Sequence, residues 1–272
     1  MNRYATLERA RDQYFSRLMV PTPPDEATRH HKNPLVIDLF AGLKGWSEPY
    51  TTDTRWTVFT VDNDPQFNST LTADILSLTP DDFPDTPTVI LASPPCTWFS
   101  VMRIGKNWTH DHQPKTDKAR YGMELVNHTL HLINELQPLY WVIENPRAKL
   151  RRLPMMLNLP RHTVTYCQYG ESRMKPTDLW GGFPSTFLPH DICANGDSCH
   201  TPAPRGSRTG TQGMDPAESA KIPFGIANDM RLAIESDLYR HNASHRTSTP
   251  EEHDAQATMD KVLFDSDRLF TP

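Results

Sequence analysis

Four short apolar runs divide the first part of the chain, and each ends in small or polar residues. The runs are residues 35–39, 57–61, 88–92 and 140–143. Between residues 125 and 136 the apolar positions instead recur at spacings of three and four, which predicts a helix that Pro138 ends. Apolar strands that alternate with helices are typical of a doubly wound, mostly parallel sheet with both faces covered, so we predict an α/β fold.

The pattern changes on both sides of this region and divides the chain into four parts. An apolar stripe with helical spacing begins the chain, and the segment before residue 222 is rich in Pro, Gly, Ser and Thr. The helical pattern returns after Ile222, and the last residues are polar and acidic. We therefore predict a helical extension (1–33), a main domain (34–180 with 222–240), a small irregular segment (181–221) and a mobile tail (241–272).

Composition narrows the class of protein. With 272 residues, 37% hydrophobic and 22% charged, the chain fits a soluble globular protein and neither a disordered nor a fibrous one. No run approaches the roughly 18–20 apolar residues of a membrane span. The N-terminus lacks the apolar core of a secretory signal, so we expect a cytoplasmic monomer with its four cysteines reduced.

Net charge decides how nucleic acid could bind. The formal charge of -5 excludes strong polyanion binding by bulk charge. Residues 144–180, however, hold seven Lys or Arg against three acids. We therefore expect phosphate contacts to come from this local basic stretch.

Small residues directly after the first strand indicate a cofactor site. Asp38 begins a stretch that ends in Gly42 and Gly45, where a ligand can approach the backbone closely. A second acid, Asp62, follows the next strand, the position from which a carboxylate binds ribose hydroxyls. The pair favours a cofactor that contains adenosine.

A thiol and a carboxyl end the next two strands. Cys96 follows Pro94 and Pro95, whose rings stiffen the loop, and polar residues surround it. Glu144 stands before Asn145 at the end of the fourth strand. A free cysteine is more often an inert apolar side chain, but this setting favours a nucleophile, with Glu144 as a proton donor to a ring nitrogen.

In this order the clusters resemble the DNA cytosine-5 methyltransferase family. Residues 38–45 are similar to its glycine-containing cofactor loop, 94–100 to its Pro-Cys nucleophile loop and 144–146 to its Glu-Asn signature. Residues 168–175 resemble a later signature with two basic positions, Arg173 and Lys175. The resemblance covers about residues 34–180 and extends less clearly to 222–234. It implies a Rossmann-like class I methyltransferase that uses S-adenosylmethionine and acts on DNA.

The resemblance also implies a role for individual residues. Cys96 would add to C6 of cytosine, Glu144 would hold the proton at N3, and Arg173 with Lys175 would hold the base carbonyl. The methyl group would then pass from S-adenosylmethionine to C5. The residues implied for the cofactor are Phe40, Ala41, Gly42, Gly45, Asp62, Asn63, Asp74, Ile75 and Pro94. Those expected to contact nucleic acid are Ser100, Arg103, Arg147, Arg151, Arg205 and Arg208.

Departures from the family pattern indicate a divergent branch of the sort found in viruses. Thr97 stands where the family has Gln, Pro146 where it has Val, and Lys175 where it has Arg. If the chain is viral, we expect it in the cytoplasm of the host cell. The short segment 181–221 predicts a recognition context of a few bases at most, read chiefly by Arg205 and Arg208.

Several other interpretations remain open. A relative of thymidylate synthase also attacks C6 from a Pro-Pro-Cys, but it has His after the Cys, and an amino-methyltransferase has an aromatic residue after Pro-Pro. An inactive homologue that only binds DNA or cofactor is a further alternative, as is an enzyme acting on RNA or a pyrimidine nucleotide. Its intact Cys96, Glu144 and Arg173 argue against the inactive homologue.

Three more cysteines and a histidine lie outside these motifs. Cys193, Cys199 and His200 have a spacing that is not standard for zinc, and Cys167 stands apart. Thiols that are close in sequence are more often only buried. A Gly/Pro-rich segment without a core often needs a metal, so zinc held by Cys193, Cys199 and His200 is the alternative.

Overall fold

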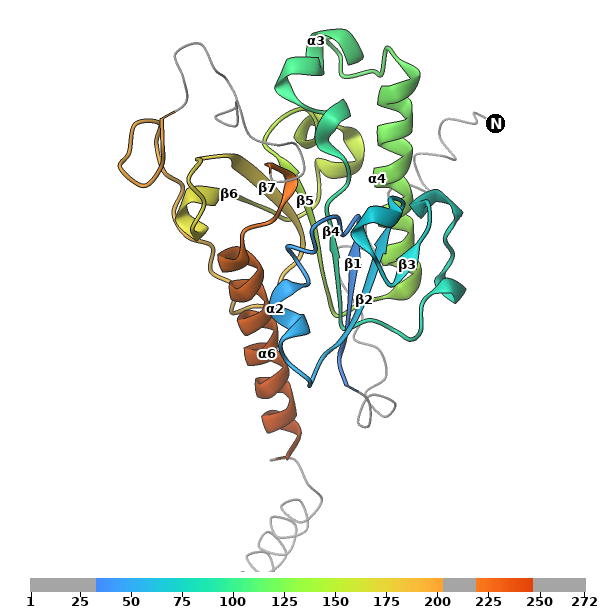
Figure 1. Cartoon of the computed structure of the whole chain (residues 1–272), viewed down its shortest axis with the longest axis vertical. Helices are drawn as coiled ribbons and strands as arrows, with labels where there is room; N and C mark the ends of the chain where they lie inside the picture. The colour runs from blue at the N-terminus through green and yellow to red at the C-terminus, as the bar shows by residue number, and fades with distance from the viewer. Residues whose placement is uncertain (1–32, 203–218, 247–272) are drawn as a thin grey trace, which may run out of the picture.

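The computed structural model describes residues 33–202 and 219–246 and contains one seven-stranded sheet (Figure 1). The strand order is β3-β2-β1-β4-β5-β7-β6, with β7 antiparallel to both of its neighbours and the other pairs parallel. The strands are β1 (Leu35–Leu39), β2 (Thr57–Asp62), β3 (Leu71–Thr72), β4 (Val89–Ala92), β5 (Tyr140–Pro146), β6 (Arg161–Thr165) and β7 (Pro176–Gly182). The predicted doubly wound, mostly parallel sheet is therefore confirmed.

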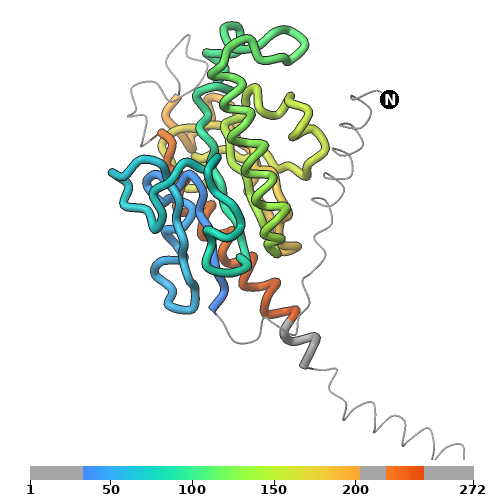
Figure 2. The backbone as a smooth tube through the Cα atoms, turned by 90° about the vertical axis from the view of Figure 1, so that its right-hand side faces the viewer, coloured from blue at the N-terminus to red at the C-terminus, as the bar shows by residue number. Residues whose placement is uncertain are grey.

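Helices cover both faces of the sheet. The α-helices are α2 (Glu48–Thr51), α3 (Ile104–Asn107), α4 (Asp117–Leu136) and α6 (Phe224–Arg246). Figures 1 and 2 show α4 and α6 on opposite sides of the sheet. Short 3-10 helices fill the connections: η2 (Pro65–Phe67), η3 (Ile75–Ser77), η4 (Pro80–Asp82), η5 (Cys96–Trp98), η6 (Val101–Arg103), η7 (Leu150–Arg152), η8 (Pro154–Met156) and η9 (Tyr166–Tyr169).

Two apolar clusters hold the layers together, and β1 contributes to both. Ile37 and Leu39 belong to the cluster that includes the buried face of α4. Val36, on the opposite face of the strand, belongs to the cluster that includes Ile226 and Met230 of α6. Because every residue of β1 is buried, its sequence is apolar on both faces apart from Asp38. This buried centre fixes where the polar strand ends emerge.

Local signals set the bounds of α4. Thr116 caps its first turn, where the hydroxyl accepts a hydrogen bond from the Ala119 amide at 3.2 Å. Gln137 at φ 47° ends the helix one residue before Pro138. The predicted helix is thus confirmed, and it begins eight residues before the first apolar position of the sequence pattern.

The antiparallel β6–β7 pair is a difference from the sequence prediction, which assigned no strand to residues 161–165. Both strands pair along their length with each other, and β7 also pairs with β5. β7 runs to Gly182, just past the predicted domain limit. The predicted extension 1–33, apart from Asn33, and most of the tail lie outside the described residues, as do Arg205 and Arg208.

The predicted helix after Ile222 is present as α6 and continues to Arg246. α6 runs beside α2 on the face of the sheet opposite α4 (Figure 1). Within residues 33–202 and 219–246, neither α6 nor any other helix combines the length and apolar character that crossing a bilayer requires.

Candidate active site

Two adjoining pockets open at the carboxyl ends of the parallel strands and share Phe40 and Pro95 in their walls. One pocket also includes Cys96 and Glu144, and the other includes Asp62. Ligands of open α/β sheets bind at this edge. All nine residues that the sequence assigned to the cofactor line one pocket or the other: Phe40, Ala41, Gly42, Gly45, Asp62, Asn63, Asp74, Ile75 and Pro94.

The loop after β1, which lines the pocket, has an unusual backbone shape. Phe40, Gly42 and Lys44 all have positive φ, at 61°, 47° and 59°. Asp62 holds this loop, because its carboxylate accepts a hydrogen bond from the Gly42 amide at 2.9 Å. The same carboxylate accepts another from the Asp64 amide at 2.9 Å. Asp62 therefore shapes the loop as well as lining the pocket.

Gly45 is required by the close approach of another segment. A Cβ on Gly45 would lie 2.6 Å from the carbonyl oxygen of Ile222, just before α6. Ile222 is buried and lines the pocket with Ala220 and Lys221. The chain before α6 therefore returns to the cofactor loop, as the resemblance implied for residues 222–234.

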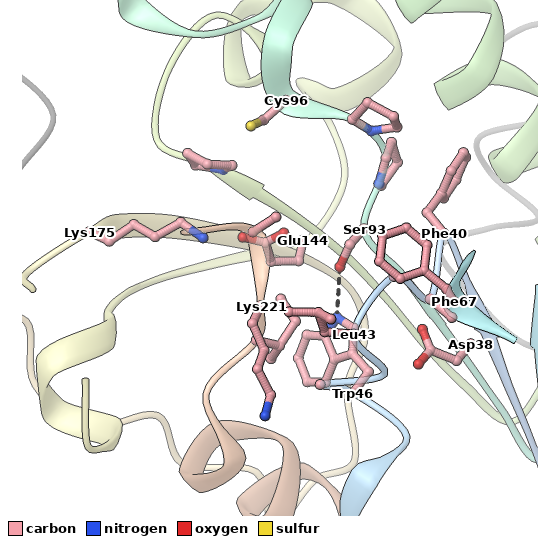
Figure 3. A pocket seen from close by; sticks show the side chains of 18 residues that line it. Asp38, Phe40, Leu43, Trp46, Phe67, Ser93, Cys96, Glu144, Lys175 and Lys221 are labelled. Carbon is pink, nitrogen blue, oxygen red and sulfur yellow. Dashed lines mark hydrogen bonds between the residues drawn. The ribbon is translucent and has the colours of Figure 1, made fainter. Parts of the chain in front are cut away.

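A buried carboxyl lies in the wall of the pocket that includes Cys96 and Glu144. Asp38 accepts hydrogen bonds from the Ser47 hydroxyl at 2.7 Å and the Ser47 amide at 3.2 Å. Burial raises the pKa of Asp38 from 3.8 to about 7, although the Ser47 hydrogen bonds oppose the shift. Beside it, the Trp46 indole donates to the Ser93 hydroxyl at 3.0 Å (Figure 3). Neither the Ser47 nor the Ser93 contact was foreseen from the sequence.

Cys96 starts η5, four residues beyond the end of β4, and neighbouring elements hold its turn. The Asn145 amide donates to the Pro94 carbonyl at 2.8 Å, which joins the Glu-Asn motif of β5 to the Pro-Pro-Cys loop. On the other side, Trp98 packs against α4 at Gly122, where a Cβ would lie 2.4 Å from the indole ring. The position of the thiol is therefore determined by β5 and α4 together.

Glu144 is almost fully buried, at 4% exposure, and faces two polar side chains. The Tyr166 hydroxyl donates to its Oε1 at 2.7 Å, and the Lys175 side chain points toward it (Figure 3). Burial raises the pKa of Glu144, and the Lys175 charge and the Tyr166 hydrogen bond only partly oppose this. The protonated form, which can donate a hydrogen bond, is therefore favoured more than for an exposed glutamate.

The Cys96 thiol is coupled to this carboxyl. Burial raises the pKa of Cys96, the charge of Glu144 raises it further, and the charge of Lys175 opposes both. Protonation of Glu144 removes its negative charge, which is one of the two effects that disfavour the Cys96 thiolate. Protonation of Glu144 therefore eases ionisation of Cys96, although burial still keeps the pKa of the thiol above its ordinary value.

Of the two predicted basic residues, the structure brings Lys175 into the pocket. Lys175 lines it, lies 4.3 Å from the Tyr166 ring centroid and donates to the Ser219 carbonyl at 2.8 Å. Its φ of 29° is unusual for a residue with a side chain. Arg173, in the preceding loop, lines neither pocket.

The loop that follows Cys96 is anchored by a buried tryptophan. Trp108 is 2% exposed and donates to the Trp98 carbonyl at 2.9 Å. Asn107 donates to the same carbonyl at 3.1 Å. In contrast, Met102 is 81% exposed, on η6 between the predicted DNA contacts Ser100 and Arg103. The exposed apex, rather than Trp108, is thus available to a ligand.

Two members of the basic stretch have internal roles, which corrects the expectation of phosphate contacts there. Arg151 donates to both carboxylate oxygens of the fully buried Asp178, at 2.8 and 2.5 Å. Lys149 is buried and contacts Nδ1 of His112 at 2.6 Å. Arg147 is exposed directly after β5 and remains available for phosphate.

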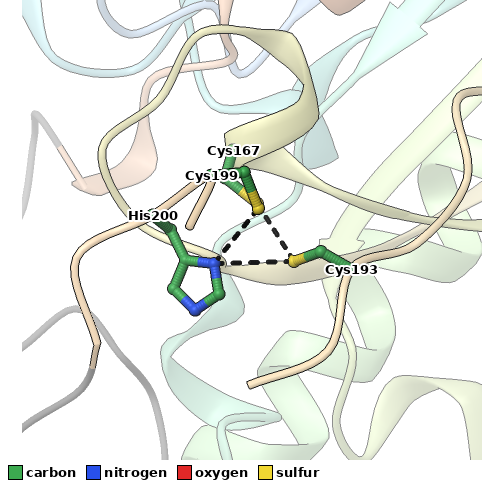
Figure 4. A group of neighbouring side chains, drawn as sticks. All are labelled: Cys167, Cys193, Cys199 and His200. Atoms are coloured by element: carbon green, nitrogen blue, oxygen red, sulfur yellow. Dashed lines mark hydrogen bonds between the residues drawn. The ribbon is translucent and has the colours of Figure 1, made fainter. Parts of the chain in front are cut away.

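A second cluster lies beside η9, away from the pocket walls. The side chains of Cys167, Cys193, Cys199 and His200 offer one ligand atom each, and these atoms all lie within 4.8 Å of one another (Figure 4). The sequence grouped the last three as metal ligands but left out Cys167. The 26 residues between Cys167 and Cys193 hid this contact, because only the fold returns the chain to η9.

Fold and site together define a Rossmann-like class I methyltransferase with a thiol and a buried carboxyl in its pocket. The sequence model described as C-5 cytosine-specific DNA methylase matches residues 35–151, which include Cys96 and Glu144. The "Probable DNA (cytosine-5)-methyltransferase" of Frog virus 3 (isolate Goorha) is 31% identical over 171 residues, or 60% of this chain and 77% of that relative. The chain therefore belongs to the family of C-5 cytosine-specific DNA methylases.

Two solved structures show weaker similarity. One is a candidate DNA modification methyltransferase encoded within a prophage (E. coli), with 18% identity, a TM-score of 0.41 and coverage of 59% of this chain. Another is TrmN from Thermus thermophilus, with 15% identity, a TM-score of 0.34 and coverage of 55% of this chain. The chain spans 52% and 43% of those two chains.

Proposed function

We propose that this protein transfers a methyl group from S-adenosylmethionine to C5 of cytosine in DNA through a covalent adduct with Cys96. The observation that carries the proposal is the meeting of Cys96, Glu144 and Lys175 in one pocket that continues into the loop after β1. Membership in the C-5 cytosine-specific DNA methylase family supports the reaction and implies the cofactor. The roles of individual residues are argued from their contacts.

The two pockets fit the two halves of the cofactor. Asp62 has carboxylate oxygens at the wall of one pocket and would accept hydrogen bonds from ribose hydroxyls, while Phe40 and Ile75 provide apolar contacts for a base. Ala41 and Gly42 line the other pocket, beside Cys96. S-adenosylmethionine supplies the methyl group when bound there.

Cys96 would act as the nucleophile. Its Sγ would form a bond to C6 of the cytosine while Glu144 gives a hydrogen bond, and in the limit a proton, to N3. This makes C5 electron-rich, and C5 then takes the methyl group. Loss of the C5 proton to a base expels the Cys96 thiolate, the N3 proton returns to Glu144, and the aromatic ring is restored.

Lys175 and Tyr166 would position Glu144. The Tyr166 hydroxyl fixes Oε1, and the Lys175 ammonium lies near the carboxyl and the thiol. We assign to Lys175 the stabilisation of charge at the base carbonyl that the family pattern gave to Arg173 as well, because Lys175 lines the pocket. Arg173 then remains a candidate contact outside the pocket wall.

Binding to DNA would use exposed groups around the pocket mouth. Arg147 and Arg103 offer positive charge there, and Met102 offers an exposed apolar side chain at the apex of η6. We keep the prediction that Arg205 and Arg208 read a recognition context of a few bases. We also keep the predictions that the protein acts as a monomer and that it acts in the cytoplasm, which is that of the host cell if the chain is viral.

The test is to express the full chain in cells that lack cytosine-5 methylation and to sequence their DNA and RNA for 5-methylcytosine. Wild type should introduce 5-methylcytosine into DNA at sites that share a few bases, and Cys96→Ser should introduce none. Calorimetry should find that both proteins bind S-adenosylmethionine. Cofactor binding without methylation of either nucleic acid would identify an inactive homologue, and methylation of RNA alone would replace the proposed substrate.

A further inference from the structure

Three thiols and one imidazole converge where η9 meets the segment after β7 (Figure 4). Sγ of Cys167 lies 3.1 Å from Sγ of Cys193 and 3.6 Å from Sγ of Cys199. Nδ1 of His200 lies 3.7 Å from the Cys193 sulfur and 3.4 Å from the Cys199 sulfur. Four potential ligand atoms from three separate places in the chain thus surround one point.

These separations match the edges of a tetrahedral zinc site. With Zn–S bonds of about 2.3 Å and Zn–N bonds of about 2.0 Å, tetrahedral ligand atoms lie roughly 3.5–3.8 Å apart. Three of the four separations given above fall within about 0.2 Å of that range, whereas Cys167 and Cys193 would need to move apart by about 0.7 Å to reach a sulfur–sulfur edge. Three cysteines with one histidine is a common structural zinc set.

The surroundings of the four groups favour a metal over simple burial. His200 is 8% exposed, and its Nε2 has no hydrogen-bond partner among the described residues, so its polar contacts are those of Nδ1 with the thiols. Buried polar groups normally have stronger partners than a thiol. The Gln168 side-chain amide donates to the Cys199 sulfur at 3.5 Å, a contact that stabilises a thiolate.

The local chain is shaped to return Cys199 to Cys193. The Asp197 carboxylate accepts from the Ala194 amide at 2.7 Å, and Gly196 adopts φ 102° in the turn between the two cysteines. Residues 183–202 contain no helix or strand, yet Cys193 and His200 are buried. A segment without regular structure gains its fixed shape from such a cross-link.

We propose that Cys167, Cys193, Cys199 and His200 bind one structural Zn²⁺ ion. Binding releases the three thiol protons to solvent and involves no oxidation or reduction, and the four ligands leave no open position for substrate. The zinc ligands take no part in methyl transfer. They are nevertheless connected to the active site through the chain, because Cys167 directly follows Tyr166, whose hydroxyl donates a hydrogen bond to Glu144. Zinc would therefore fix η9 and the start of the segment that leads to Arg205.

The test uses the full chain, purified without chelators, and measures metal content by mass spectrometry of the elements. Wild type should hold about one zinc per chain, and Cys199→Ser should hold less than about one tenth of that. The matched control is Cys96→Ser, which removes the cysteine outside the cluster and should keep the zinc. Replacement of zinc by Co²⁺ in wild type should give the visible absorption bands of a tetrahedral thiolate site, a readout that does not require any variant to fold.

Four results would overturn the zinc site, and none depends on enzymatic activity. One is wild type free of metal, and another is equal zinc in wild type and Cys199→Ser. The third is a mass of the unreduced protein that is lower by two hydrogen atoms, with Cys167 and Cys193 joined in one peptide, since their sulfurs are also close enough to form a disulfide after a small movement. Iron in place of zinc would equally contradict it.

Discussion

The active-site edge of the sheet and the segment after β7 place their functional groups in different ways. At the edge, Asp38 and Glu144 stand within strands, and Cys96 follows a strand within four residues, so the buried sheet positions them. Residues 183–202 contain no helix or strand, and their buried polar groups instead lie in the cluster formed by the sulfur atoms of three cysteines and His200. Chemistry that needs fixed geometry therefore depends on backbone pairing in one region and on side-chain ligands in the other.

The two regions meet at η9. Tyr166 contacts Glu144 of the active-site edge, and the next residue, Cys167, belongs to the cysteine cluster. Adjacent side chains of one 3-10 turn thus point to different sites. We expect changes at the active-site edge to alter rate or affinity while the fold persists, and changes at the cluster to alter the fold itself.

The largest effect on rate, apart from loss of Cys96, should follow Glu144→Gln. The amide cannot give a proton to N3, so kcat should fall by roughly 10²–10⁴-fold, the usual range for a lost general acid. Tyr166→Phe is the matched variant, because it keeps the carboxyl and removes only its 2.7 Å hydrogen bond. It should lose much less. Equal losses in single-turnover methylation would show that position, rather than proton donation, is what Glu144 provides.

A smaller effect, on affinity alone, should follow Asp62→Ala. Removal of a charged hydrogen-bond acceptor should weaken S-adenosylmethionine binding by about 1.5–3 kcal/mol, or roughly 10- to 150-fold. Asp64→Ala is the control, because Asp64 caps η2 and lines neither pocket. Calorimetry should show weak binding for the first variant and nearly normal binding for the second. Unchanged affinity in Asp62→Ala would leave this acid with only its role in holding the Gly42 loop.

Asp38 should make stability depend on pH. Because its pKa is raised from 3.8 to about 7, the folded state holds this proton more tightly than the unfolded chain. Its contribution to stability is therefore complete below about pH 4 and is lost as pH rises through about 7. Asp38→Asn removes this titration. Between about pH 5 and pH 8, urea denaturation should show wild type losing at least about 1 kcal/mol more than the variant. Parallel losses would place the titration elsewhere.

The smallest expected effect is on DNA binding, and it distinguishes Arg147 from Arg151, four residues further along the chain. Arg147→Ala should weaken DNA binding and reduce the slope of log affinity against log salt by about one, with no change in thermal stability. Arg151→Ala should instead lower stability, because it leaves the buried Asp178 without its ion-pair partner. If Arg147→Ala leaves the salt slope unchanged, the phosphate surface lies elsewhere.

Much of the sheet was predictable because its central strands are short and apolar. The runs at β1, β2, β4 and β5 are visible in the sequence since both faces of each strand are covered. β6 and β7 were missed for the opposite reason. β6 begins with the exposed Arg161, and its pairing with β7 depends on contacts that no local pattern records.

The residues that the sequence assigned to a cofactor all line the two pockets, because the strand ends and the loops after them meet at one edge of the sheet. Side-chain pairing was not predictable. No local pattern indicates that Arg151 faces Asp178 or that Tyr166 faces Glu144, since both contacts cross from one element to another. Cys167 is the same case, although the rarity of cysteine in this chain offered a hint.

The most direct test of the account is covalent trapping. Wild-type protein, S-adenosylmethionine and DNA that contains 5-fluorocytosine are incubated together, and the product is analysed by denaturing electrophoresis and peptide mass spectrometry. Fluorine at C5 cannot leave as a proton does, so the account predicts a stable adduct joined through the peptide that contains Cys96, and none with Cys96→Ser. Methylation of ordinary cytosine by the Cys96→Ser variant, or an adduct through another residue, would contradict it.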